Sequence, residues 1–292
     1  MITRRSALGR FAGGAMLAAS MASLVQRLAA AESAAGAGLK GRINHSVCKW
    51  CYDKIPLETL CQAGPEIGLQ SIELLTVEDF PTLKKYGLIC AMVTGVPGGI
   101  PDGFNRMENH DALAAFFSAT LPQVAGAGYP NMICFSGNRN GMSDEQGLDN
   151  CAVGLKRLMG LAEKNKVNIC LELLNSKVNH NDYMGDHTAW GFELCQRVGS
   201  DRFKILYDIY HMQIMEGDVI RTIQDNHQYI GHYHTGGVPG RHEIDETQEL
   251  YYPAIMQAIV ATGFKGYVAQ EFIPKRPDAL ASLKQGVHIC DV

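Results

Sequence analysis

Short apolar runs alternate with longer segments of helical periodicity from residue 43 onward. The runs are rich in Ile, Val and Leu, as is typical of strands that are buried on both faces of a parallel sheet. The pattern predicts eight strands, at Ile43–Cys48, Ser71–Leu75, Ile89–Gly95, Asn131–Gly137, Asn168–Leu174, Phe203–His211, Ile230–Thr235 and Gly266–Phe272.

The segments between these runs are typical of amphipathic helices. Asp111–Ala127 has Leu113 and Phe117 at helical spacing, and Leu148–Lys164 and Thr188–Val198 behave similarly. No G-x-G-x-x-G motif follows the first strand, which argues against an open doubly wound sheet. Eight β-then-α units in about 250 residues therefore predict an α/β fold with a single (β/α)8 TIM barrel.

The first residues resemble a cleavable export signal. Arg4 and Arg5 follow Thr3, a weakly apolar stretch covers 11–25, and Ala29–Ala31 offers an A-x-A cleavage site. The adjacent arginines resemble a twin-arginine signal, which implies export to the periplasm. We expect a twin-arginine signal peptide in 1–31, a linker in 32–41 and the TIM-barrel catalytic domain in 42–292.

Composition and charge narrow the function classes. Hydrophobic residues make up 46% of the chain and charged residues 19%, which is enough apolar material for a large core. The net charge is −4, and removing residues 1–31 leaves 22 basic against 30 acidic side chains, or −8. This excess of acidic side chains argues against a protein that binds the phosphate backbone of nucleic acids. No apolar run reaches the 18 or so residues that a membrane-spanning helix needs. We expect a small-molecule partner and no stable membrane anchor, and the sequence allows a homo-oligomer.

Acidic or imidazole side chains stand inside or at the end of four consecutive predicted strands. In a TIM barrel, catalytic groups lie at the C-terminal ends of strands and in the loops that follow. A buried carboxylate is costly unless it is paired or holds a metal. The four strands offer Glu172, Asp208, His234 and Glu271. Three carboxylates and one imidazole suit Mn²⁺ or Mg²⁺, with Co²⁺ as a further option, and predict a site for one divalent cation.

Two further histidines and a cysteine pair need interpretation. His211 comes three residues after Asp208, and we expect it at the barrel mouth, binding a substrate oxygen. His232 alternates with His234, so the two share a face one layer apart, and we expect His232 to be structural. Cys48 and Cys51 form a lone C-x-x-C motif, and we expect one core thiol and one loop thiol rather than a redox or zinc pair.

The sixth predicted strand carries a family resemblance. Tyr207–Asp218 reads YDIYHMQIMEGD and resembles the strand-six motif of the hydroxypyruvate isomerase family, within the xylose isomerase-like barrel superfamily. Ile230–His232 and Val238–Glu243 resemble the strand-seven region of the same family. The resemblance covers about residues 42–290.

This resemblance implies roles for the candidate residues. Glu172 and Glu271 would be the proton donor/acceptor pair as well as metal ligands, and Asp208 would also bind the metal. His211 and Arg241 match the positions at which the family binds its substrate.

One position departs from the family pattern. In the hydroxypyruvate isomerase family, strand seven carries a motif similar to G-H-V-Q. The corresponding residues of this chain are Gly231-His232-Tyr233-His234. Histidine at the last of these positions resembles the ketose 3-epimerases of the tagatose/psicose kind. Both reactions need the same residues, because one carboxylate removes a proton and the other returns it to the neighbouring carbon or to the same carbon.

We predict a divalent-metal-dependent isomerase of the aldose-ketose type, similar to hydroxypyruvate isomerase, that acts through an enediolate on a small hydroxy-carbonyl compound. The expected substrate is a small hydroxy-keto acid or a ketose. The alternative is a ketose 3-epimerase. An apurinic endonuclease-like hydrolase is less favoured, because it would need more metal-binding His and Asp residues and a basic groove. A non-catalytic sugar-binding protein is also less favoured, because it has no need for two opposed carboxylates on one metal.

Overall fold

The computed structural model describes residues 38–292, and Gly41–Val292 form one compact unit. The expected signal peptide in 1–31 lies outside the described residues, as does most of the expected linker. Within the described part of the chain, no helix has the length and apolar character needed to cross a membrane.

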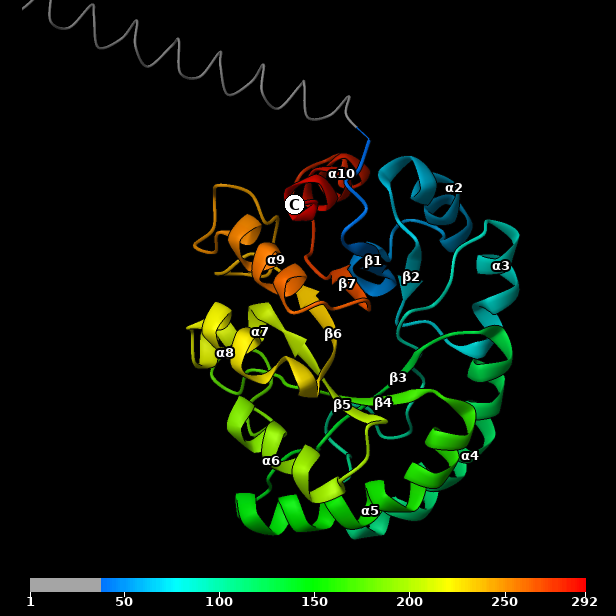
Figure 1. The fold of residues 1–292 in the computed structure, drawn as a ribbon, viewed down its shortest axis with the longest axis vertical. Helices are drawn as coiled ribbons and strands as arrows, with labels where there is room; N and C mark the ends of the chain where they lie inside the picture. The colour runs from blue at the N-terminus through cyan, green and yellow to red at the C-terminus, as the bar shows by residue number, and fades with distance from the viewer. Residues whose placement is uncertain (1–37) are drawn as a thin grey trace, which may run out of the picture. The chain divides into compact units, whose positions relative to one another are not determined.

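The compact unit is a TIM-barrel-like α/β fold. Its sheet has seven parallel strands among the described residues, in the order β2-β1-β7-β6-β5-β4-β3. Figure 1 shows the helices on the outside of the ring of strands. The strands are β1 (Asn44–Cys48), β2 (Ser71–Glu73), β3 (Asn131–Cys134), β4 (Asn168–Glu172), β5 (Phe203–Asp208), β6 (Ile230–Thr235) and β7 (Tyr267–Gln270). The helices are α2 (Leu57–Ile67), α3 (Phe80–Lys85), α4 (His110–Ala127), α5 (Asp144–Asn165), α6 (Thr188–Val198), α7 (Ile209–Met215), α8 (Val219–Asn226), α9 (Tyr252–Ala261) and α10 (Ala279–Cys290).

The prediction of a regular strand at Ile89–Gly95 is wrong. This segment makes only isolated parallel bridges, to residues of the β2 region on one side and to β3 on the other. The ladder is interrupted at Ala91, whose N–H donates to Ser71 Oγ at 2.9 Å and whose carbonyl accepts from Asn131 Nδ2 at 2.8 Å. Side chains thus replace two ladder hydrogen bonds, and the segment still lies between β2 and β3 where an eighth strand would stand.

The predicted strand Phe203–His211 also ends earlier than expected. Asp208 closes β5, and its Oδ1 accepts from the backbone N–H groups of Tyr210 at 2.8 Å and His211 at 3.2 Å. A carboxylate that accepts from the first free N–H groups caps a helix, so α7 begins at Ile209. His211 is therefore in the first turn of α7 instead of at a strand end.

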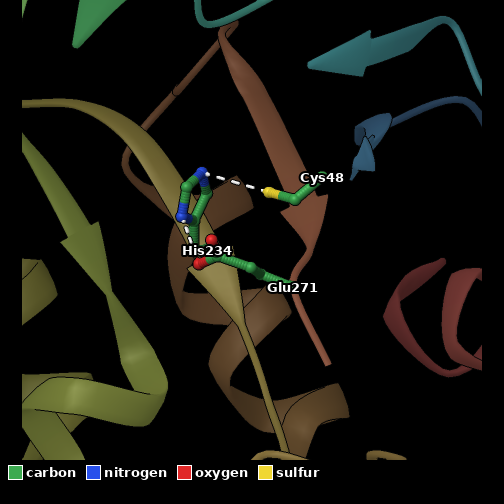
Figure 2. A group of neighbouring side chains, drawn as sticks. All are labelled: Cys48, His234 and Glu271. Carbon is green, nitrogen blue, oxygen red and sulfur yellow. Dashed lines mark hydrogen bonds and ion pairs between the residues drawn. The ribbon is translucent and has the colours of Figure 1, made fainter. Parts of the chain in front are cut away.

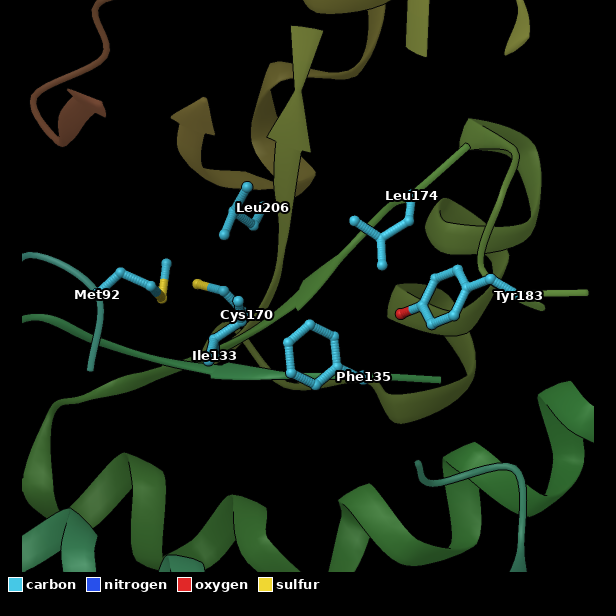
Figure 3. Close-up of a cluster of buried hydrophobic side chains, with 7 residues drawn as sticks. All are labelled: Met92, Ile133, Phe135, Cys170, Leu174, Tyr183 and Leu206. Carbon is cyan, nitrogen blue, oxygen red and sulfur yellow. The ribbon is translucent and has the colours of Figure 1, made fainter. Parts of the chain in front are cut away.

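Apolar side chains fill the barrel beside the strands that carry the candidate site (Figure 3). Tyr183, in the loop after β4, lies in this cluster, and its hydroxyl donates to the carbonyl of Glu172 at 2.9 Å. The same hydroxyl accepts from the backbone N–H of Ser136 at 3.0 Å. Packing in the cluster therefore fixes the end of β4. The cluster consists of Met92, Ile133, Phe135, Cys170, Leu174, Tyr183 and Leu206.

Candidate active site and metal centre

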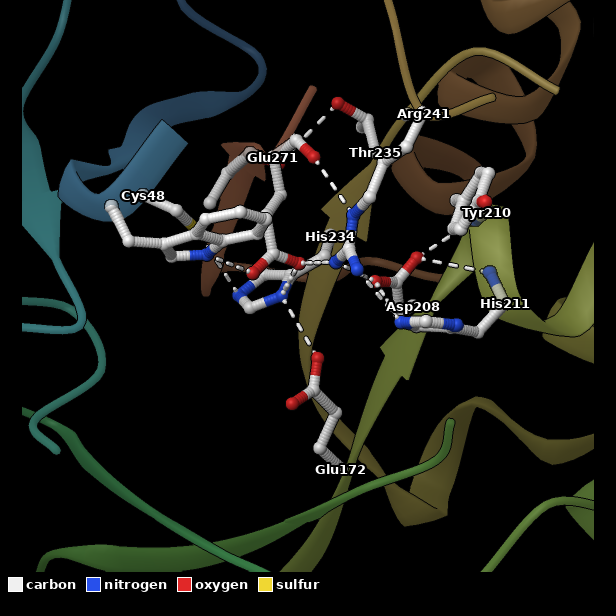
Figure 4. Close-up of polar contacts among 12 residues, drawn as sticks. Cys48, Glu172, Asp208, Tyr210, His211, His234, Thr235, Arg241 and Glu271 are labelled. Carbon is white, nitrogen blue, oxygen red and sulfur yellow. Dashed lines mark hydrogen bonds and ion pairs between the residues drawn. The ribbon is translucent and has the colours of Figure 1, made fainter. Parts of the chain in front are cut away.

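The four predicted ligand residues meet at the carboxyl ends of four neighbouring strands (Figure 4). Glu172 and Asp208 are the last residues of β4 and β5, His234 lies near the end of β6, and Glu271 directly follows β7. Asp208 and His234 are register partners across the β5–β6 ladder. All four side chains are buried, and one ligand atom from each lies within 4.8 Å of the others.

The imidazole of His234 has two different edges. Its Nε2 lies 2.9 Å from Glu73 Oε1, whereas its Nδ1 lies 2.6 Å from Glu271 Oε2 and 3.4 Å from Glu172 Oε1. Neither Nδ1 nor Glu172 Oε1 makes a hydrogen bond of good geometry, although both are buried. A buried acceptor such as Glu172 Oε1 is costly without a donor or a cation beside it, and a carboxylate 2.6 Å from Nδ1 requires a proton or a cation on that nitrogen. The residues present therefore fit a divalent cation.

Cys48 lies at the other edge of the same ring (Figure 2). Its Sγ is 3.7 Å from His234 Nε2, and the trio Cys48, His234 and Glu271 is a second possible ligand group. Burial raises the pKa of the Cys48 thiol well above its usual range, and the nearby Glu271 carboxylate raises it further. A neutral thiol is a poor ligand, so the carboxylate group is the better metal site. Cys51 lies in the short 3-10 helix Lys49–Tyr52 that follows β1, and it is buried as well.

The guanidinium of Arg241 lies among the carboxylates. Its Nη2 donates to Asp208 Oδ2 at 2.8 Å and to Glu271 Oε2, and its Nε donates to the carbonyl of Glu271 at 3.1 Å. The guanidinium also packs over the rings of Trp50 and Tyr210. Arg241 is one of the two predicted substrate-binding residues, and it lines the site cavity.

The two catalytic candidates have opposite electrostatic surroundings. Burial raises the pKa of Glu172, and the negative charge of Glu271 raises it further. Burial also opposes ionisation of Glu271, but Arg241 and His234 outweigh it and hold the pKa of Glu271 well below its usual range. Environments that separate the pKa values of two carboxyl groups favour one as an acid and the other as a base.

His211 lies deeper than the sequence suggested. Its side chain is fully buried, its Nδ1 accepts from the N–H of Asn175 at 3.1 Å, and its Nε2 lies 3.0 Å from Arg241 Nη1. The early start of α7 explains this, because it places the ring beneath the loop that follows β4. His180 of that loop, which packs against His211 with ring centroids 5.3 Å apart, lines the cavity instead.

Sequence reasoning missed two residues of the site. Glu73 closes β2 and contacts both His232 and His234. An acidic residue in the apolar run Ser71–Leu75 was the available signal, and it is the same signal that marks Glu172. Trp50 follows β1, and its Nε1 donates to Glu271 Oε1 at 2.7 Å. Nothing in the local pattern distinguishes Trp50 from a surface aromatic residue.

A cavity of about 590 Å³ opens over these residues. Glu172, Glu271 and Arg241 contribute its charged groups, and His180 lies at its wall. Most of the remaining wall is apolar, including Leu74, Ile100, Ile133, Phe135, Leu174 and Ile273. A small molecule with one polar end and few charges fits such a lining.

Comparison with known proteins places the chain in a family. The family model for the xylose isomerase-like TIM barrel matches residues 81–288. A putative hydroxypyruvate isomerase of Homo sapiens is 31% identical over 237 residues, which cover 77% of this chain and 78% of the human protein. A 2-oxo-tetronate isomerase of Pectobacterium atrosepticum is 24% identical over 242 residues, covering 77% and 89% of the two chains. The chain belongs to the xylose isomerase-like TIM barrel family, which confirms the predicted resemblance.

Solved structures share the fold. An AP endonuclease, family 2, from Brucella melitensis matches with a TM-score of 0.72 at 19% identity, covering 84% of this chain and 96% of that one. The 3-keto-D-glucoside 4-epimerase of E. coli matches with a TM-score of 0.71 at 17% identity, covering 84% and 97%. Because the relatives are named as isomerases, the chain is an enzyme of the isomerase class.

Proposed function

We propose that this enzyme is a divalent-metal-dependent isomerase that acts through an enediolate on a small hydroxy-keto acid. The convergence of Glu172, Asp208, His234 and Glu271 carries the proposal, because one ligand atom from each lies within 4.8 Å of the others and two of the four residues line the cavity. The names of the two relatives, a hydroxypyruvate isomerase and a 2-oxo-tetronate isomerase, support this substrate class.

The four residues would hold the cation through three carboxylate oxygens and His234 Nδ1. This donor set favours Mn²⁺ or Mg²⁺, and Co²⁺ is a useful substitute. A bound divalent cation polarises the substrate carbonyl and stabilises the negative charge of the enediolate.

Glu172 and Glu271 would move the proton. They come from β4 and from the residue after β7, with β5 and β6 between these strands, and both line the cavity, so they would flank a bound substrate. One carboxylate removes the proton beside the carbonyl, and the other returns a proton to the neighbouring carbon. Trp50 donates to Oε1 of Glu271 and so directs its other oxygen toward the site.

Arg241 and His211 would bind the substrate. Arg241 is the guanidinium that lines the cavity, and it supplies the positive charge that a keto-acid carboxylate needs. Nε2 of His211 lies 3.0 Å from Nη1 of Arg241, so His211 would act on the substrate through Arg241 and not by direct contact.

Proton exchange from D₂O tests this function. The purified enzyme, with its metal content measured, is incubated with a panel of small hydroxy-keto acids and ketoses, and solvent deuterium is followed by NMR. We expect one divalent cation per chain and deuterium on the carbon beside the carbonyl of a hydroxy-keto acid. Substoichiometric metal with full activity, or no exchange with any member of the panel, would contradict the proposal.

A ketose 3-epimerase is the second candidate. His234 replaces the glutamine expected of a hydroxypyruvate isomerase, and an epimerase shares the fold. The same panel separates the two functions. An epimerase returns deuterium to the same carbon with inverted configuration, whereas an isomerase moves the carbonyl to the neighbouring carbon.

A further inference from the structure

Glu73 is a buried carboxylate to which the proposed reaction assigns no part. It is the last residue of β2 and is fully buried. Its Oε1 lies 2.7 Å from His232 Nε2 and 2.9 Å from His234 Nε2 and accepts from Cys48 Sγ at 3.9 Å, and its Oε2 accepts from Ser46 Oγ at 2.5 Å. All four partners can donate, which is the arrangement that an ionised carboxylate requires.

The contact with Glu73 determines which nitrogen of His234 carries a proton. An ionised carboxylate can only accept, so a hydrogen bond to Oε1 places the proton on Nε2. The other nitrogen, Nδ1, faces Glu271 and Glu172 at 2.6 and 3.4 Å. A ring nitrogen this close to a carboxylate carries a proton unless a cation takes its place. When a cation binds, Nδ1 therefore gives up its proton and offers its lone pair, while Nε2 keeps the proton that Glu73 accepts.

The Glu73 carboxylate also fixes the orientation of the His234 ring. His232 and His234 are two residues apart on β6, with ring centroids 5.2 Å apart and planes at 86°. Because both rings donate to one oxygen, and Ser46 of β1 donates to the other, the Glu73 carboxylate has little freedom to turn. The His234 ring is therefore held from the side opposite the candidate metal ligands.

We propose that Glu73 is a positioning residue of the metal centre. It holds Nε2–H of His234 and so aims the Nδ1 lone pair at the cation. The proposal rests on the proposed function only in requiring that the four-residue group binds a divalent cation. A merely structural contact between β2 and β6 predicts lost stability with unchanged metal binding, whereas the positioning role predicts lost metal affinity.

Glu73→Gln tests the proposal with little change in side-chain size. An uncharged amide is a weaker acceptor and can donate through its nitrogen, so it no longer enforces the Nε2–H form of His234. Titration with Co²⁺ alone, followed by calorimetry and visible absorption, should give a Kd roughly 10- to 100-fold weaker than wild type. The absorption bands of bound Co²⁺ should also change, because the imidazole ligand is less well oriented.

The outcomes separate this proposal from the function itself. A folded Glu73→Gln protein that binds Co²⁺ with the wild-type Kd and spectrum overturns the positioning role. A wild-type protein that binds no Co²⁺ contradicts the proposed function instead.

Glu243→Gln is the matched control for the loss of a buried carboxylate. Glu243 is 6% exposed and accepts from the N–H of Lys275 at 3.0 Å and from Ser282 Oγ at 2.9 Å. Its hydrogen bonds thus go to the loop after β7 and to α10 instead of to the candidate ligands. This variant should lose stability and keep the wild-type Kd for Co²⁺.

A measurement on the wild type decides the matter if Glu73→Gln does not fold. Long-range ¹H–¹⁵N spectra of histidine-labelled, Mg²⁺-loaded protein report which nitrogen of each ring is protonated. We expect His234 to carry its proton on Nε2 and none on Nδ1. A proton on Nδ1 in the Mg²⁺-loaded protein would overturn the proposal.

Discussion

Glu172 and Glu271 belong to one cluster, yet their neighbours differ. Glu271 receives hydrogen bonds from Trp50 and Arg241, whereas Oε1 of Glu172 makes none. Donors stabilise an ionised carboxylate, and their absence in a buried place favours the protonated form. The two residues are therefore suited to different halves of a proton transfer.

Replacing each of these glutamates should separate proton removal from proton return. Glu172→Gln and Glu271→Gln, supplied with excess metal, should each lose turnover by about 10²- to 10⁴-fold. They should differ in deuterium exchange, because only the variant that keeps the proton-removing carboxylate still exchanges substrate protons with D₂O. The measurement is turnover and exchange by NMR on variants with unchanged melting temperatures. Near-normal turnover in either variant would refute the paired-carboxylate mechanism.

Which site residues can be predicted from sequence depends on where they stand. Glu172, Asp208 and Glu271 stand near the ends of apolar runs, and the convergence of strand ends in a barrel brings such residues together. Glu73 stands inside a run in the same way, but its partners are two histidines that lie far away in the sequence. The burial of His211 could not be predicted, because it depends on the helix that Asp208 begins.

At the scale of elements, side-chain hydrogen bonds hold the segment 89–94 between β2 and β3, where a regular strand would use backbone hydrogen bonds. Ser71 Oγ accepts the N–H of Ala91, and both residues are fully buried. A buried N–H that loses its acceptor costs about 1–3 kcal/mol. The hydroxyl of Ser71 is therefore part of the contact between β2 and its neighbour.

Ser71→Ala should destabilise the fold by about 1–3 kcal/mol, because the N–H of Ala91 is left without its acceptor. Urea unfolding of the variant and the wild type measures the difference. The matched control is Ser118→Ala on the exposed face of α4, which should change stability by no more than about 0.5 kcal/mol. Equal stability of Ser71→Ala and wild type would show that the bond contributes nothing.

Element type was more predictable than element ends. Thr188–Val198 forms a helix with the predicted bounds, because its apolar spacing is regular and Gly199 ends it in a left-handed conformation. Helix α5 begins at Asp144 rather than Leu148, since Ser143 Oγ accepts from the N–H of Gln146 at 3.2 Å. Capping hydrogen bonds of this kind set the boundaries, whereas apolar periodicity marks only the interior of an element.

For the whole molecule, His45 makes stability depend on pH. It lies in β1 with 1% exposure, and neither ring nitrogen makes a hydrogen bond. Burial lowers its pKa from 6.5 to about 4, against the Asp291 carboxylate, which raises it. The folded protein therefore keeps the ring neutral down to about pH 4, whereas the unfolded chain takes up a proton near pH 6.5. The free energy of unfolding is thus unaffected by His45 above pH 6.5 and falls as the pH is lowered from 6.5 to about 4.

The loss should amount to roughly 3 kcal/mol between pH 6.5 and 4. His45→Leu should flatten this part of the pH dependence, since an apolar side chain takes up no proton. Urea unfolding at several pH values measures the effect, with exposed His227→Ala as the control. An identical pH dependence in His45→Leu and wild type would exclude His45 as the source.

Export is a prediction from the first 31 residues alone. If Arg4 and Arg5 are read by the twin-arginine route, replacing both with lysine should leave the precursor in the cytoplasm. Cell fractionation of the full chain, with and without the change, measures the result. Normal appearance of the double variant in the periplasm would refute the twin-arginine route.

Arg241 provides a positive charge within the chain for two of the candidate ligands. Its guanidinium forms ion pairs with both Asp208 and Glu271. We therefore expect the protein to stay folded when a chelator removes the proposed cation, because these buried carboxylates keep a positive partner. If the proposed cation takes Asp208 and Glu271 as ligands, it would compete with the guanidinium for the same oxygens. Arg241 would then be available to bind an anionic substrate, which would couple binding of the cation to binding of the substrate.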